Sequence, residues 1–134
     1  MSLSGDDKTL LTRLYLEKSH MYMEDSERLI ALGSLSSAAN RLYYAVFHAV
    51  HALFVANGIT SKSHHGTNTQ FHQHFVKTGM FEPRFGRYIA TLEVLREKAD
   101  YNVMYNVSRS ELEAMKPTAE ELIKQIENVL NNQN

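Results

Sequence analysis

The chain has 134 residues, of which 43% are apolar and 10% aromatic, and this predicts one folded domain instead of a disordered segment. Its 14 Lys and Arg side chains nearly balance 15 Asp and Glu, which excludes a protein that coats nucleic acid or membranes by bulk charge. The absence of cysteine excludes disulfides, thiolate metal sites and cysteine nucleophiles.

The first element is a predicted helix over residues 7–31, where apolar residues recur at helical spacing. Asp6 or Asp7 is expected to cap its start, and Gly33 to end it. A single domain is expected across residues 1–134, with residues 1–4 set aside as disordered or left over from cloning. Since the sequence has no secretory signal and no run of ~20 apolar residues, we expect a cytoplasmic protein that does not contact membranes.

Ser36 or Ser37 is predicted to cap a second helix that ends near Asn57. Apolar residues cover most of its circumference, which is typical of a central, buried helix.

One stripe of this second helix departs from the apolar pattern, because it contains Arg41, Tyr44, Ala45, His48 and Ala52, with Asn40 and His51 at its edge. A buried arginine is costly unless it is paired. The stripe therefore fits two structures. It is either the solvent face of the helix, which is the commoner case, or a functional groove between helices or at a dimer interface.

Residues 59–68 show no periodicity and predict a loop, followed by a short third helix over residues 69–78. Four of the seven histidines lie here, but they are adjacent or two apart and do not converge as metal ligands require. We therefore expect no metal site and no other cofactor. Lys62 and His64 are expected in a polar loop over one end of the bundle, where they fit a phosphate or a carboxylate.

A fourth helix is predicted over residues 83–101. The last helix opens with the capping-box spacing of Ser108 and Glu111 and ends near Leu130. Pro117 is expected to kink this helix or to split it. No segment alternates as a strand does, so the predicted fold is all-α: an antiparallel, up-and-down bundle of four main helices with one additional short helix.

Arg96, Asp100 and Tyr101 lie at the end of the fourth helix. The order of cation before anion makes a weak helical ion pair, and a carboxylate near a helix C-terminus opposes the helix dipole. Either the two residues form a plain surface pair, or Asp100 has another partner, such as Arg41 across the bundle.

Four segments in this order carry a resemblance to a known family: Ala38–Ala49, Lys62–Gly66, Phe75–Gly79 and Arg96–Tyr101. Their sequences, AANRLYYAVFHA, KSHHG, FVKTG and REKADY, resemble the signatures of HEPN-domain proteins. The likeness is greatest to a small, single-domain prokaryotic branch of that superfamily. The resemblance implies an antiparallel helical bundle that forms a homodimer.

Some HEPN proteins are metal-independent ribonucleases, often toxins neutralised by a nucleotidyltransferase-like antitoxin. Their active site is an Arg-x(4–6)-His motif. Here the resemblance places the motif arginine at Arg96, but Asp100 and Tyr101 stand where the histidine is expected. It therefore implies a module that self-associates and binds RNA, a nucleotide or a nucleotidyltransferase partner, without the standard catalytic histidine.

A polar site forms if the second and fourth helices are neighbours. In a binding site, Arg41 and Arg96 hold a phosphate and Tyr44 or Tyr101 stacks on a base. In a ribonuclease, which is the alternative, His48 moves the proton and an arginine stabilises the transition state. A third alternative is a non-catalytic dimerisation scaffold.

Overall fold

The computed structural model describes residues 3–133, so expectations for residues 1 and 2 lie outside the described part. The described residues form α-helices and one π-helical turn, with no strand among them. The elements are α1 (Gly5–Leu32), α2 (Leu35–Ala56), α3 (His64–Phe71), η1 (His72–Val76), α4 (Pro83–Tyr101) and α5 (Arg109–Gln133). The predicted all-α fold is confirmed.

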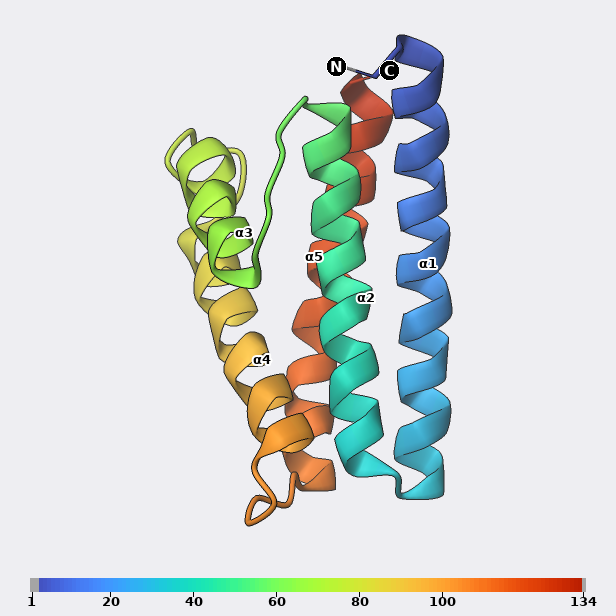
Figure 1. The fold of residues 1–134 in the computed structure, drawn as a ribbon, viewed down its shortest axis with the longest axis vertical. Coiled ribbons are helices and arrows are strands. Elements are labelled where there is room, and N and C mark those ends of the chain that lie inside the picture. Colours follow the sequence, from blue (N-terminus) through green and yellow to red (C-terminus); the bar gives the residue numbers. More distant parts are fainter. Residues whose placement is uncertain (1–2, 134) are drawn as a thin grey trace.

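The long helices α1, α2, α4 and α5 lie side by side, and each runs opposite to the one before it (Figure 1). Helix α2 packs against α1, α4 and α5, and its many fully buried side chains confirm that it is the central helix. The short α3 lies against α4, beside the long segment that leaves the end of α2 (Figure 1).

Small side chains bring α1 and α2 close together. Ala38, Ala45 and Ala52 recur every seven residues on α2, and all three are fully buried. Opposite them, the Ser19 hydroxyl donates to the Ala45 carbonyl at 2.6 Å, and the Ser26 hydroxyl donates to the Ala38 carbonyl at 2.9 Å. Each serine thus satisfies its own polar atom inside the interface, so the close packing leaves no hydroxyl unpaired.

The start of α1 differs from the prediction. Ser4 is the N-cap, and its hydroxyl accepts from the Asp7 amide at 3.1 Å. The predicted cap at Asp6 or Asp7 is wrong, because both aspartates lie inside the first turn, where their charge favours the helix dipole. Gly33 ends the helix as predicted, with a left-handed φ of 79°.

The start of α2 also differs from the prediction of a cap at Ser36 or Ser37. The helix begins at Leu35, and the Ser34 carbonyl accepts the first bond, from the Ala38 amide at 3.0 Å. The left-handed turn at Gly33 is short, so the N-cap is Ser34, two or three residues earlier than predicted.

The predicted loop over residues 59–68 is too long, because α3 begins at His64. Ser63 caps this helix by accepting from the Gly66 amide at 2.9 Å. The Thr67 hydroxyl donates to the Ser63 carbonyl at 3.0 Å. A cap and local side-chain bonds therefore support a helix that lacks apolar periodicity. The predicted third helix over residues 69–78 ends early, at Val76, after a π-helical turn.

Helix α4 has the bounds predicted from its sequence, and α5 extends slightly beyond its predicted end. The capping box is confirmed, since Ser108 accepts from the Glu111 amide at 3.1 Å while Glu111 accepts from the Ser108 amide at 2.8 Å. The alternative that Pro117 splits the last helix is wrong, because α5 continues through it.

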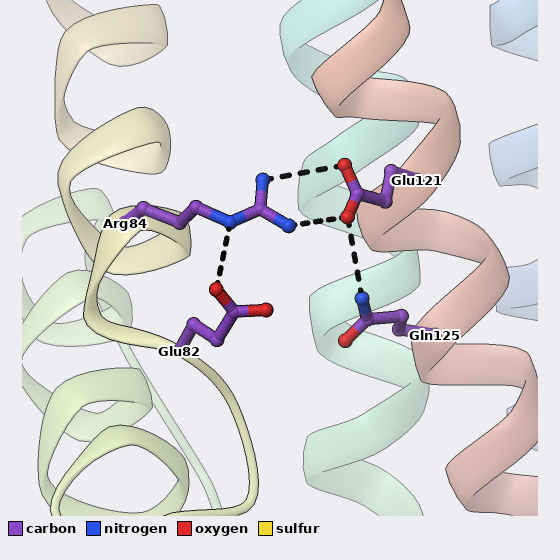
Figure 2. Close-up of polar contacts among 4 residues, drawn as sticks. All are labelled: Glu82, Arg84, Glu121 and Gln125. Atoms are coloured by element: carbon purple, nitrogen blue, oxygen red, sulfur yellow. Dashed lines mark hydrogen bonds and ion pairs between the residues drawn. The ribbon is translucent and has the colours of Figure 1, made fainter.

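An arginine joins α4 to α5 near the start of α4 (Figure 2). Arg84 donates through both terminal nitrogens to the two carboxylate oxygens of Glu121, and its Nε donates to Glu82 at 3.0 Å. This hydrogen bonding to carboxylates raises the pKa of Arg84. Every nitrogen of this guanidinium has a carboxylate partner, which makes it a useful comparison for the arginine described next.

Candidate functional site

Arg96 enters the molecule from α4 and lies against the aromatic side chains of α2. It is only 4% exposed. Its guanidinium carbon lies 5.0 Å from the ring centre of Tyr43, 5.8 Å from that of Tyr44 and 6.0 Å from that of Tyr101. Aromatic faces attract a cation through their quadrupole, so three rings hold this guanidinium in place.

The polar partners of Arg96 are distant by comparison. Its terminal nitrogens lie 3.7 Å from Asp100 and 3.9 Å from Glu97, which is beyond hydrogen-bond distance. Its Nε is buried without a partner among the described residues. Unlike Arg84 (Figure 2), Arg96 therefore keeps N–H donors that no protein acceptor occupies. Such a guanidinium can accept an anion as a ligand.

Asp100 does have a partner on another helix, but it is not Arg41. The Asn40 side-chain amide donates to Asp100 at 3.0 Å, and the Asn40 carbonyl oxygen accepts from Arg41 at 2.6 Å. The expected direct pair of Arg41 and Asp100 is thus replaced by a chain through Asn40. Arg41 itself is exposed and lies 5.4 Å from the ring centre of Tyr22.

His48 is enclosed by aromatic rings of α1. Its ring centre lies 5.7 Å from that of Tyr15 and 5.1 Å from that of Tyr22, and its Nδ1 is buried without a partner among the described residues. Burial, followed by the nearby His51 and Lys18, lowers the pKa of His48 to about 4. At neutral pH this imidazole is uncharged and accepts protons poorly.

No hydrogen bond joins Arg96 and His48, the two residues of the ribonuclease alternative, among residues 3–133. Tyr44 touches both, since its ring centre is 5.8 Å from the Arg96 guanidinium and 6.2 Å from the His48 ring. The α2 stripe is not a plain solvent face. Ala45 and Ala52 are buried, Tyr44 and His48 are half-buried, and Arg41 is exposed.

His64 is the first residue of α3, and its ring lies beside the aromatic side chains of Tyr43 and Phe47 on α2. Its Nδ1 is 2.6 Å from the Tyr43 hydroxyl, and its ring centre is 4.8 Å from that of Phe47. The predicted position over one end of the bundle is therefore wrong for His64, which packs against the side of α2. Lys62 is exposed and forms no ion pair with any residue in 3–133.

Sequence reasoning missed two residues that shape this site. It counted Tyr43 as part of the apolar surface of α2, although this buried side chain contacts both His64 and Arg96. It placed Asn40 only at the edge of the polar stripe. A signal existed for Tyr43, since a buried tyrosine hydroxyl usually needs a hydrogen-bond partner.

The chain matches the HEPN domain family over residues 12–131. It is 26% identical to a "UPF0332 protein" of Thermotoga maritima over 93% of this chain and 95% of the relative. It is 31% identical to the "Putative toxin MJ0142" of Methanocaldococcus jannaschii over 73% of this chain and 67% of the relative. The "Putative toxin MJ0605" of the same organism is 32% identical, over 70% and 75% of the two chains.

No group of three or more His, Asp or Glu side chains in residues 3–133 is arranged to hold a metal ion. No helix in that range combines the length and apolar character needed to cross a membrane.

Proposed function

Because the chain belongs to the HEPN domain family, we propose that it is a HEPN-type module that binds single-stranded RNA, or a nucleotide, around Arg96. The observation that carries this proposal is the state of Arg96, which is buried, held by three rings and without a hydrogen-bonded acceptor among residues 3–133. A phosphate oxygen supplies the missing acceptor. A fixed guanidinium binds it more strongly than a mobile surface lysine does, because less side-chain entropy is lost.

The neighbouring residues have complementary roles in this proposal. The exposed ring of Tyr101 and the half-buried ring of Tyr44 offer faces on which a base stacks. Arg41 and Lys62 add positive charge near the phosphate backbone. Asp100, held by Asn40, orients Arg96 from the side without occupying its donors.

RNA binding can be measured by fluorescence anisotropy with a short, labelled single-stranded RNA. We expect Arg96→Ala to weaken binding by roughly ten- to a hundredfold, the value of a charge-assisted contact. The matched control is Arg87→Ala, because Arg87 is exposed and lies on the opposite face of α4. Equal losses in the two variants would show that only net charge matters and would contradict the proposed site.

A second candidate function is a metal-independent ribonuclease that acts as a toxin. It is favoured by the printed names of two relatives, the putative toxins of Methanocaldococcus jannaschii. In this case Arg96 stabilises the transition state and His48 transfers the proton. The low pKa of His48, and the lack of a hydrogen bond between His48 and Arg96 among residues 3–133, weigh against it.

Incubation of the purified protein with RNA distinguishes the two candidates. Binding alone predicts intact RNA in every sample. Cleavage that persists with a metal chelator and is lost in both Arg96→Ala and His48→Ala would replace the binding function by the ribonuclease function. A control with His72→Ala, an exposed histidine far along the chain, tests whether the loss is specific to His48.

The proposal also covers location and partners. We propose that the protein is cytoplasmic, forms a homodimer and pairs with a nucleotidyltransferase-like antitoxin. The exposed apolar side chains after α4 support a protein contact near the site, since Val103 is 95% and Met104 is 87% exposed. If the chain bound no RNA, and substitutions at Arg41, His48, Arg96 and Asp100 only weakened dimerisation, the scaffold alternative would be correct.

A further inference from the structure

Tyr43 and His64 form a hydrogen-bonded pair whose geometry determines which nitrogen of the imidazole faces outward. The Tyr43 hydroxyl and His64 Nδ1 are 2.6 Å apart. Tyr43 is only 2% exposed, and its hydroxyl makes no other hydrogen bond among residues 3–133. This single contact must therefore satisfy the phenol proton, because a buried donor without an acceptor is costly.

The direction of the hydrogen bond follows from this requirement. If His64 Nδ1 carried the proton and donated to Tyr43, the phenol proton would have no acceptor. If Tyr43 donates, both groups are satisfied and the neutral imidazole carries its proton on Nε2. Burial, with the negative charge of Glu93, raises the pKa of Tyr43 and keeps the phenol protonated, which agrees with its role as the donor.

The outer nitrogen is open to a ligand. His64 Nε2 has no hydrogen-bond partner in residues 3–133 and is not among the fully buried polar atoms. The same tyrosine that holds Nδ1 also lies under Arg96, whose guanidinium carbon is 5.0 Å from the Tyr43 ring centre. Tyr43 thus positions both the imidazole of His64 and the guanidinium of Arg96.

The backbone at the start of α3 holds His64 in this position. Ser63 caps the helix, and the Ser61 hydroxyl donates to the Ser63 carbonyl at 3.1 Å. A Cβ atom on Gly66 would lie 3.0 Å from the Ser63 hydroxyl, so glycine allows the compact cap. On the other side, the Asn68 amide donates to Glu93 of α4 at 2.6 Å. These contacts fix α3 against its neighbours.

From this geometry we infer that Tyr43 is a positioning residue, which locks neutral His64 with its Nε2–H outward as a hydrogen-bond donor to a phosphate oxygen beside Arg96. The inference rests on the proposed RNA-binding function and extends it. It assigns His64 to ligand binding and not to proton abstraction, because an imidazole nitrogen that already carries its proton cannot act as a base.

The first test is the tautomer of His64, read from two-bond ¹H–¹⁵N spectra of the ¹⁵N-labelled chain at pH 8. Comparison with His64→Gln identifies the His64 signals. We expect the proton on Nε2 and an unprotonated Nδ1. A proton on Nδ1 would overturn the inference, whatever the protein does with RNA.

The second test is a double-mutant cycle on binding of a short, fluorescein-labelled single-stranded RNA. His64→Ala should weaken binding by about tenfold, the value of one hydrogen bond to a charged acceptor. Tyr43→Phe, which keeps the ring beneath Arg96, should weaken it less. His64→Gln should retain most of the affinity, since its side-chain amide carries a donor near the position of Nε2.

The cycle separates positioning from a general structural role. If Tyr43 acts through His64, Tyr43→Phe has no further effect in the His64→Ala background. Additive losses would show that the hydroxyl acts elsewhere and would overturn the positioning role. If the wild-type chain does not bind RNA at all, the proposed function and the phosphate role of His64 both fail, while the tautomer measurement still decides the Tyr43–His64 pairing.

Discussion

Arg84 and Arg96 lie on one helix, yet their guanidinium groups have opposite surroundings. Arg84 is half-exposed, and carboxylates occupy all of its nitrogens (Figure 2). Arg96 is buried, and its nearest carboxylates stay beyond hydrogen-bond distance. A desolvated charge with unsatisfied donors adds little to stability. Its presence at this position is therefore better explained by ligand binding than by folding.

This difference predicts that removing the Arg96 charge has opposite effects on stability and on binding. Arg96→Met fills a similar volume without a desolvated charge, so the free energy of unfolding should stay the same or rise by about 1 kcal/mol, while RNA binding weakens as in Arg96→Ala. Urea unfolding monitored by circular dichroism measures the first effect. A clear fall in the unfolding midpoint would show that Arg96 has a structural role instead.

His48 makes the folded state sensitive to acid. Burial, with His51 and Lys18 nearby, lowers its pKa to about 4, whereas an unfolded imidazole has a pKa of about 6.5. Between these values the unfolded chain binds more protons, so the free energy of unfolding decreases as the pH falls from 7 towards 4 and then levels off. Because His48 is only half-buried and solvent screens part of its charge, we expect a loss of about 1–2 kcal/mol.

The comparison of His48→Phe with wild type tests this effect by urea unfolding at pH 7 and pH 5. The variant should lose less stability between the two pH values, although His51 keeps part of the dependence because burial also lowers its pKa. His72→Phe, at an exposed histidine, should behave as wild type does. Identical losses in all three chains would exclude His48 as the acid-sensitive group.

At the scale of elements, the interface of α1 and α2 depends on small residues. Ala45 is fully buried, and the Ser19 hydroxyl bonds to its carbonyl. Ala45→Leu leaves no room for the added carbons unless the helices move apart, so we expect a loss of about 1–3 kcal/mol. Ala90→Leu is the control, since Ala90 is an exposed position of α4. Equal midpoints of thermal unfolding in the two variants would contradict close packing of α1 on α2.

Elements with a clear apolar repeat were predictable from the sequence, and those held by tertiary or local polar contacts were not. The bounds of α4 follow from Pro83 and from its periodic apolar residues. Helix α3 could not be found by periodicity, because its support comes from the Ser63 cap and from hydroxyl groups bonded to their own backbone.

The same distinction applies to the candidate site. The spacing of Arg96 and Asp100 within one helix indicates a polar site. Whether Arg41 and Tyr44 join that site depends on α2 lying next to α4, which the sequence alone does not establish. The contact of Tyr43 with His64 joins residues 21 positions apart, so it depends on how α3 packs against α2. Helical periodicity within one segment carries no information about such a contact.

At the scale of the whole molecule, apolar side chains remain on the surface. They gather along the outer side of α1 and after α4, and include Leu10, Leu14, Met21, Val103 and Met104. Exposed apolar side chains that lie close together favour association with another protein chain. We expect light scattering at micromolar concentration to give twice the mass of one chain. A mass equal to one chain across the concentration range would contradict the proposed homodimer.

The central claim is that the Arg96 guanidinium binds the phosphate of RNA. It is tested most directly by following the arginine Nε–H signals of the ¹⁵N-labelled chain during titration with single-stranded RNA. We predict that the Arg96 signal, assigned by its loss in Arg96→Lys, shifts to saturation with the RNA, while the signal of Arg87 stays in place. An unchanged Arg96 signal in a chain that binds RNA would contradict the claim, because the ligand would then lie elsewhere.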